Sequence, residues 1–216
     1  MVPKMAAVGA LLLALVVTLW APGAGACLGS WSESGCGAGC PAIVPKAPYC
    51  SETVTGQNIA SVLTAPADQV VVMTGGDSGL GYTTAEALAQ AGSTLVIGSL
   101  RTADGNAAAA AIKAATKSSK VEILPLDLSS LASVRAFAAS VAKAHPHVNV
   151  LINCAGIVQN ITGLPALTVD GFERVFQVNY LGHHLLSELL LPALRPVAGR
   201  VLNPPRDSRA EPLFRV

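Results

Sequence analysis

The chain has 216 residues, of which 51% are hydrophobic and 12% charged, and this balance excludes an intrinsically disordered protein. Its 14 basic and 13 acidic residues leave a net charge of +1, which argues against a polybasic surface for nucleic acid or an anionic membrane. Aromatic residues make up only 4% of the chain, which argues against a base-stacking platform.

The first 26 residues form an apolar leader. Lys4 is the only charge before Glu33, and residues 5–20 are almost wholly apolar. The small residues at 24–26 are typical of a cleavage site. The pattern favours a signal peptide over 1–26, and hence the secretory pathway, as an ER-lumenal or secreted protein. An uncleaved membrane anchor and an organelle-targeting leader are the alternatives.

Residues 27–68 are predicted to be a linker, because they are rich in Cys, Gly and Pro and show little periodicity. Four of the five cysteines lie here, namely Cys27, Cys36, Cys40 and Cys50. In an oxidising compartment they allow three disulfide pairings, and free thiols in a linker are the alternative. A zinc site is disfavoured because no histidine lies nearby, so no metal is expected.

Residues 69–91 combine a strand, a glycine-rich turn and a helix. The β-branched run at 69–73 is typical of a buried parallel strand. The turn Thr-Gly-Gly-Asp-Ser-Gly-Leu-Gly follows at 74–81, and a helix is expected over 83–91. Glycines let the backbone approach a pyrophosphate, and the helix start offers N–H donors to it. This order therefore predicts a phosphate-binding turn, with an ordinary tight turn as the alternative.

Strands and helices then alternate as far as residue 203. Further strands are expected at 93–98, 121–124, 148–152 and 200–203, with helices over 102–116, over 131–141 and over 170–191. Ser129 or Ser130 is expected to cap the second of these helices, Asp170 to cap the third, and Pro192 to stop it. Repeated units of this length predict a parallel sheet covered on both faces.

Three polar segments follow strands of this sheet, namely 74–81, Asp127 and 153–156. Ligands of such sheets bind beyond the carboxyl ends of the strands, so a cofactor is expected there. Asn179 is an amide on an otherwise apolar helix face and must be hydrogen-bonded if it is buried. His183 and His184 have no metal-spaced partner, and surface or packing roles are expected for both.

These motifs resemble the short-chain dehydrogenase/reductase family over about 69–203, and segments 133–137 and 170–173 resemble its retinol-dehydrogenase-like branch. Residues 74–81 match its Thr-Gly-x-x-x-Gly-x-Gly motif, and 153–156 resemble its Asn-Asn-Ala-Gly element with Cys154 in the second place. The resemblance implies an α/β, Rossmann-type doubly wound parallel sheet. It also implies hydride transfer between a nicotinamide dinucleotide and a small alcohol or carbonyl substrate.

The resemblance also implies roles for single residues. Asp127 matches the aspartate that contacts the adenine ring, and Asn179 matches the asparagine of the catalytic tetrad. The predicted cofactor-binding residues are Thr74, Gly75, Asp77, Ser78, Gly79, Leu80, Gly81, Arg101, Asp127, Leu128, Asn153, Ala155 and Gly156. NADP is favoured over NAD, because Arg101 lies just after the second strand and no acidic residue ends it. Leu100 occupies the place where the family usually has its arginine, and Asp104 comes several residues later.

The chain departs from the family at its proton donor. Tyr49, Tyr82 and Tyr180 all lack a lysine four residues later, and prolines follow Asn203 where the family continues toward its serine. We therefore expect a truncated reductase domain, incomplete after the fifth strand, with an irregular tail over 204–216 and no turnover. Whether the chain is an enzyme is thus open. A non-enzymatic nucleotide-binding or scaffold protein and a secreted cysteine-rich module are the alternatives.

Overall fold

The computed structural model describes residues 31–32, 35–36, 68–158 and 166–203. The predicted leader over 1–26, all but four residues of 27–67, and the predicted tail over 204–216 lie outside the described residues. Near the N-terminus, the short strands β1 (Trp31–Ser32) and β2 (Gly35–Cys36) pair antiparallel. Among the helices that are described, none is long and apolar enough to cross a membrane.

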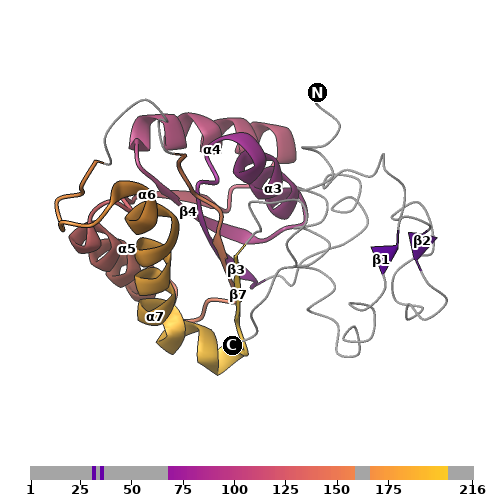
Figure 1. The fold of residues 1–216 in the computed structure, drawn as a ribbon. Coiled ribbons are helices and arrows are strands. Elements are labelled where there is room, and N and C mark those ends of the chain that lie inside the picture. Colours follow the sequence, from indigo (N-terminus) through magenta and orange to yellow (C-terminus); the bar gives the residue numbers. More distant parts are fainter. Residues whose placement is uncertain (1–30, 33–34, 37–67, 159–165, 204–216) are drawn as a thin grey trace.

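Five parallel strands form the central sheet (Figure 1). They are β3 (Val70–Thr74), β4 (Thr94–Ser99), β5 (Val121–Pro125), β6 (Val150–Asn153) and β7 (Arg200–Leu202). Their order is β5-β4-β3-β6-β7. The chain runs outward from β3 to β5 and then returns to the other side of β3 as β6. The predicted Rossmann-type parallel sheet is thus confirmed, and its strand order reverses between β3 and β6, where such sheets bind their ligands.

Helices cover both faces of the sheet. The helices α3 (Gly79–Gln90) and α4 (Thr102–Thr116) lie on one side, and α5 (Leu131–Ala144) and α7 (Gly182–Leu194) lie on the other (Figure 1). Successive residues of a strand point to opposite faces, so β3 contributes to two cores. Met73 packs with Leu88 and Ile112 on one face, while Val72 packs with Phe137 on the other.

The prediction of one helix over 170–191 was wrong at both ends. The helical segment begins with α6 (Arg174–Phe176), continues as a π-helical turn, η2 (Gln177–Leu181), and runs through α7 into a 3₁₀ turn, η3 (Arg195–Val197). Pro192 lies inside α7 and does not stop it. Proline has no backbone N–H, so Pro192 removes one helical hydrogen bond, but only in the last turn of α7.

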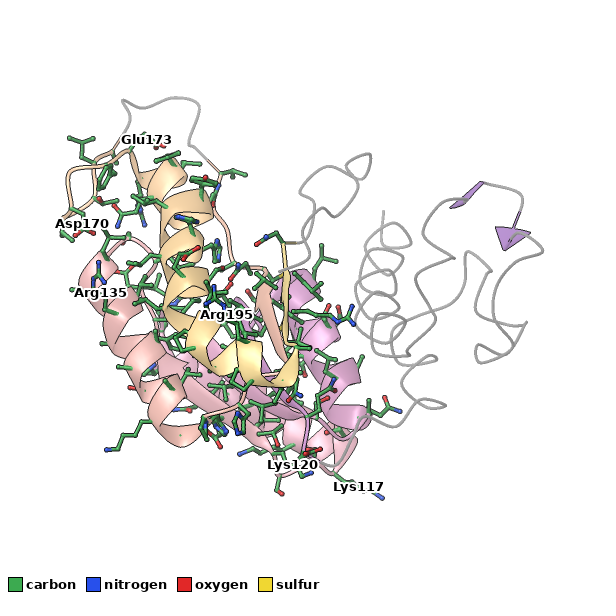
Figure 2. All side chains as sticks on the ribbon, turned by 90° about the horizontal axis from the view of Figure 1, so that it is seen from below. Lys117, Lys120, Arg135, Asp170, Glu173 and Arg195 are labelled. Carbon is green, nitrogen blue, oxygen red and sulfur yellow. The ribbon has the colours of Figure 1, made fainter. Side chains whose placement is uncertain are left out.

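Glu173, and not Asp170, caps this segment. The Glu173 carboxylate accepts hydrogen bonds from the backbone N–H groups of Val175 at 2.8 Å and Phe176 at 2.7 Å. Gly171 has a left-handed φ of 82°, which separates Asp170 from the helix. The Asp170 carboxylate instead accepts from the N–H of Leu131 at 2.8 Å, at the start of α5. Figure 2 shows Glu173 at the start of the helical segment and Asp170 beside it, next to α5.

The remaining element bounds lie close to the predicted ones. The bounds of α4 agree with the prediction, while α3 begins at Gly79, within the glycine-rich turn and four residues earlier than expected. Ser130 is the cap of α5, with its Oγ accepting from the N–H of Ser133 at 3.3 Å. The glycine-rich turn therefore leads directly into a helix.

Candidate functional site

The predicted site segments meet at the carboxyl edge of the sheet. Thr74, the last residue of β3, is in register with Gly98 of β4 and with Asn153 of β6. The N–H of Leu126 donates to the carbonyl of Ser99 at 2.9 Å, which brings the chain before Asp127 to the same edge. Three segments that are far apart in the sequence are thus neighbours beyond the strand ends, as expected for a parallel sheet.

The glycine-rich turn between β3 and α3 is built on close backbone approaches. Gly75 and Gly79 have left-handed φ values of 65° and 55°. A Cβ atom on Gly81 would lie 1.9 Å from the carbonyl oxygen of Gly75, and one on Gly75 would lie 2.8 Å from the Cα of Ala155. A Cβ on Gly79 would meet nothing within 4 Å. The turn is therefore closely packed on one side and open at the start of α3.

The start of α3 carries no side-chain cap. Ser78 occupies the N-cap position in an extended conformation, but its side chain makes no capping hydrogen bond. The first N–H groups of any α-helix lack partners within the helix and attract anions. Together with the open space at Gly79, this gives room and N–H donors for a phosphate group.

Thr74 joins this edge to α7. Its Oγ1 accepts a hydrogen bond from the N–H of Ala155 at 3.0 Å and lies 2.9 Å from Nε2 of His183. Nδ1 of His183 lies 3.3 Å from the carbonyl oxygen of Asn179. Thr74 and His183 are both buried. Of the surface or packing roles expected for His183, the structure shows packing, but the contact with Thr74, 109 residues away, had no signal in the sequence.

Asn179 holds the turn that follows β6. Its Oδ1 accepts from the N–H of Ile157 at 2.9 Å, and its Nδ2 donates to the carbonyl oxygen of the same residue at 2.8 Å. The prediction that this amide must be hydrogen-bonded is confirmed. Both polar atoms of the side chain bind the backbone of the same residue, Ile157, so the π-helical turn that carries Asn179 positions the loop after β6. A catalytic role for Asn179 stays a prediction.

Replacing Asn179 by aspartate tests this positioning role. An aspartate still accepts from the N–H of Ile157 but, when ionised, cannot donate to the carbonyl of Ile157. We expect the Asn179→Asp variant to lose about 2 kcal/mol of unfolding free energy, since it leaves a partly buried acceptor without its donor. Chemical denaturation at pH 7 measures this loss.

Asn149→Asp is the matched control for that experiment, because the side-chain hydrogen bond of Asn149 is made by Oδ1, which accepts from the N–H of Val70 at 2.8 Å. An aspartate retains that acceptor, so a small change is expected. Equal losses in the two variants would contradict the role given to the Nδ2 donor of Asn179.

A small polar cluster lies at the end of β4. The Oγ of Ser99 donates to Oδ2 of Asp77 at 2.5 Å and lies 3.0 Å from the carbonyl oxygen of Arg101. Nε of Arg101 forms an ion pair with Oδ2 of Asp104 at 2.7 Å. The side chains of this pair are 80% and 54% exposed, so the pair contributes little to stability. Asp77 thus links the glycine-rich turn to the end of β4, a contact that sequence reasoning missed.

Asp127 and Leu128 follow β5 at the same edge. The Asp127 carboxylate accepts from the N–H of Ser129 at 2.8 Å and from its hydroxyl at 2.6 Å, which fixes the turn before α5. Leu128 is buried, and its carbonyl oxygen lies 2.9 Å from where a Cβ on Gly182 would be. This close approach seats the start of α7 against the turn.

The segment after β6 divides into buried and accessible residues. Nδ2 of Asn153 donates to Oγ of Ser187 at 3.1 Å and to Oδ1 of Asn203 at 2.9 Å, so this amide joins β6 to α7 and to the end of β7. Its buried Oδ1 has no hydrogen-bond partner among the described residues. Ala155 is half-buried and Gly156 is exposed. Within the described ranges, no group of His, Cys, Asp and Glu side chains could hold a metal ion.

Comparisons with known proteins agree with this geometry. The sequence pattern of the family described as "short chain dehydrogenase" matches residues 69–204, more than half of the chain. Retinol dehydrogenase 12 of Mus musculus is 42% identical over 137 residues, which cover 62% of this chain and 42% of that protein. Retinol dehydrogenase 13 of Homo sapiens is 40% identical over 163 residues, which cover 74% of this chain and 48% of that protein. The chain thus spans less than half the length of these two relatives.

A solved structure shares the fold. The Pseudomonas aeruginosa RhlG/NADP active-site complex superposes with a TM-score of 0.56 at 28% sequence identity. The match covers 64% of this chain and 55% of that chain. The Rossmann-like arrangement of the described strands is therefore shared with a protein whose structure is described as a complex with NADP.

Proposed function

This chain belongs to the short-chain dehydrogenase family, and on that premise we propose that it binds NADP(H) at the carboxyl edge of its sheet. The observation that carries the proposal is the glycine-rich turn. It is closely packed at Gly81, open at Gly79, and leads into a helix without a side-chain cap. Such a turn gives a pyrophosphate both space and N–H donors.

The other predicted cofactor residues fit the same dinucleotide. Arg101 is exposed just beyond β4, where a cation can contact the 2′-phosphate of NADP. Asp127 and Leu128 would lie along the adenine, and residues 153–156 would border the nicotinamide half. NADP is preferred over NAD in this proposal because of Arg101, and the NADP complex of the structural relative supports that preference.

When it is bound, the nicotinamide supplies or accepts a hydride at the carbon of an alcohol or carbonyl substrate. That reaction also needs a proton donor whose pKa is brought toward neutrality. In the family this is a tyrosine followed by a lysine four residues later, and these 216 residues contain no such pair. We therefore propose that these residues bind the cofactor without turnover. The alternative function, a non-enzymatic nucleotide-binding or scaffold protein, would give the same result. The leader over 1–26 would take the chain into the secretory pathway.

Fluorescence titration of the purified full chain with NADPH tests the binding. We expect saturable binding in the wild-type chain and about tenfold weaker binding in the Gly79→Ala variant, since alanine disfavours the left-handed φ of 55° by about 1–2 kcal/mol and shifts the turn. An aldehyde added to the bound chain should leave the NADPH absorbance unchanged. Oxidation of NADPH would contradict the proposed lack of turnover and assign the proton transfer to another group.

Gly171→Ala is the matched control. Gly171 also has a left-handed φ, of 82°, and a Cβ there would also meet nothing within 4 Å, but it lies in the turn before α6. Both variants carry a similar backbone strain, and only Gly79→Ala should weaken NADPH binding. Equal weakening in both variants, or a folded wild-type chain that binds no NADPH, would contradict the proposal.

A further inference from the structure

The chemistry that separates NADP from NAD is a single phosphate on the adenosine ribose. In dinucleotide-binding sheets, the residue that recognises this 2′ group comes about 20 residues after the glycine-rich turn. It is a carboxylate that binds a bare hydroxyl, or a nearby cation that binds the phosphate. Ser99 follows Gly79 by 20 residues and ends β4. Because Ser99 is not acidic, the sequence offers no carboxylate from this strand.

The fold brings a carboxylate to this place from another segment. Oδ2 of Asp77, in the glycine-rich turn, lies 2.5 Å from the hydroxyl of Ser99. Ser99 is 1% exposed, and a Cβ on Gly105 would lie 2.8 Å from its Cβ, so its hydroxyl is held by the packing of α4 on β4. Asp77 is only half-buried. Its carboxylate is therefore fixed at the end of β4 and still accessible to a ligand.

Arg101 is the cation of this cluster, and it already pairs with a carboxylate of the protein. Its guanidinium pairs with Asp104, and both side chains are largely exposed. An exposed pair is weak, so a phosphate can compete with Asp104 for the guanidinium. Asp77 is held by Ser99 and would remain beside a 2′-phosphate as a like charge. The cluster thus combines one cation with two carboxylates.

We propose that Asp77 is a specificity-determining residue, which opposes the 2′-phosphate and reduces the preference for NADP(H) that Arg101 provides. This inference rests on the proposed function, because it concerns the same cofactor site. Specificity is a difference between two affinities, and a fixed like charge lowers one of them selectively. The wild-type chain should consequently prefer NADPH over NADH by a smaller factor than a chain that lacks the Asp77 charge.

The test compares dissociation constants for NADPH and NADH, measured on the full chain at one ionic strength. Asp77→Asn keeps the size of the side chain and an oxygen that accepts from Ser99, but removes the charge. We expect this variant to bind NADPH about fivefold more tightly, as removal of one partly screened like charge implies, and to bind NADH within twofold of the wild type. Arg101→Gln should weaken NADPH binding and leave NADH binding unchanged.

Asp68→Asn is the matched control, because Asp68 is exposed just before β3, at the opposite edge of the sheet. It removes the same charge and should change neither affinity. If both dinucleotides bind but Asp77→Asn leaves the ratio of the two constants unchanged, or raises the affinity for both equally, the role of Asp77 is overturned and the proposed function stands. If the folded wild-type chain binds neither dinucleotide, both are overturned.

Discussion

The Gly81→Ala variant is expected to lose both its stability and its dinucleotide binding. A Cβ on Gly81 would lie 1.9 Å from the carbonyl oxygen of Gly75 and 2.8 Å from the carbon of that carbonyl. Both atoms belong to the backbone, so no side-chain rotation relieves the clash. Either the turn or the start of α3 must move, and we expect a loss of about 3 kcal/mol of unfolding free energy, near the upper end for overpacked sites.

Gly76→Ala is the control within the same turn. The atoms nearest to a Cβ on Gly76 are side-chain atoms of Ile97 and Met73, at 3.1 to 3.2 Å, and these can adjust. Urea denaturation should therefore place Gly76→Ala well above Gly81→Ala in stability, and NADPH titration should show binding only for Gly76→Ala. Similar midpoints for the two variants would mean that the approach of α3 to Gly75 is not the constraint that we describe.

Most of the sheet could be predicted from the sequence, because buried parallel strands are short apolar runs and the helices between them carry clear apolar stripes. The alanine-rich α4 was predicted with its observed bounds. The last helical segment was not, since Asp170 and Glu173 are both plausible caps and local chemistry does not choose between them. The choice depends on Leu131, 39 residues away, because its N–H donates a hydrogen bond to the Asp170 carboxylate.

The candidate site shows the same division. Glycines in a fixed motif and an amide on an apolar face are local signals, and the structure bears out the turn and the hydrogen-bonded state of Asn179. The bonds from Asp77 to Ser99 and from Thr74 to His183 join residues on different elements. Such pairs depend on how strands and helices meet in space, and the residue pattern of a single chain does not encode that.

Thr74 provides the second large expected effect. It is fully buried, and its hydroxyl contacts both the N–H of Ala155 and Nε2 of His183. Valine has the same shape without the hydroxyl, so Thr74→Val breaks both contacts and leaves the packing intact. We expect it to lose about 2–4 kcal/mol of unfolding free energy, because each broken buried hydrogen bond costs about 1–3 kcal/mol. Denaturant midpoints measure the loss.

Thr74→Ser separates the hydroxyl from the methyl group. It keeps the oxygen and removes one buried methyl group, which should cost about 1 kcal/mol. In a double-mutant cycle with His183→Phe, the losses of Thr74→Val and His183→Phe should sum to about 1 kcal/mol more than the loss of the double variant, since both remove one shared contact. Additive losses, or a serine variant less stable than the valine variant, would mean that Thr74 acts through packing alone. A coupled pair would instead show that α7 fixes the end of β3, on which the dinucleotide-binding turn is built.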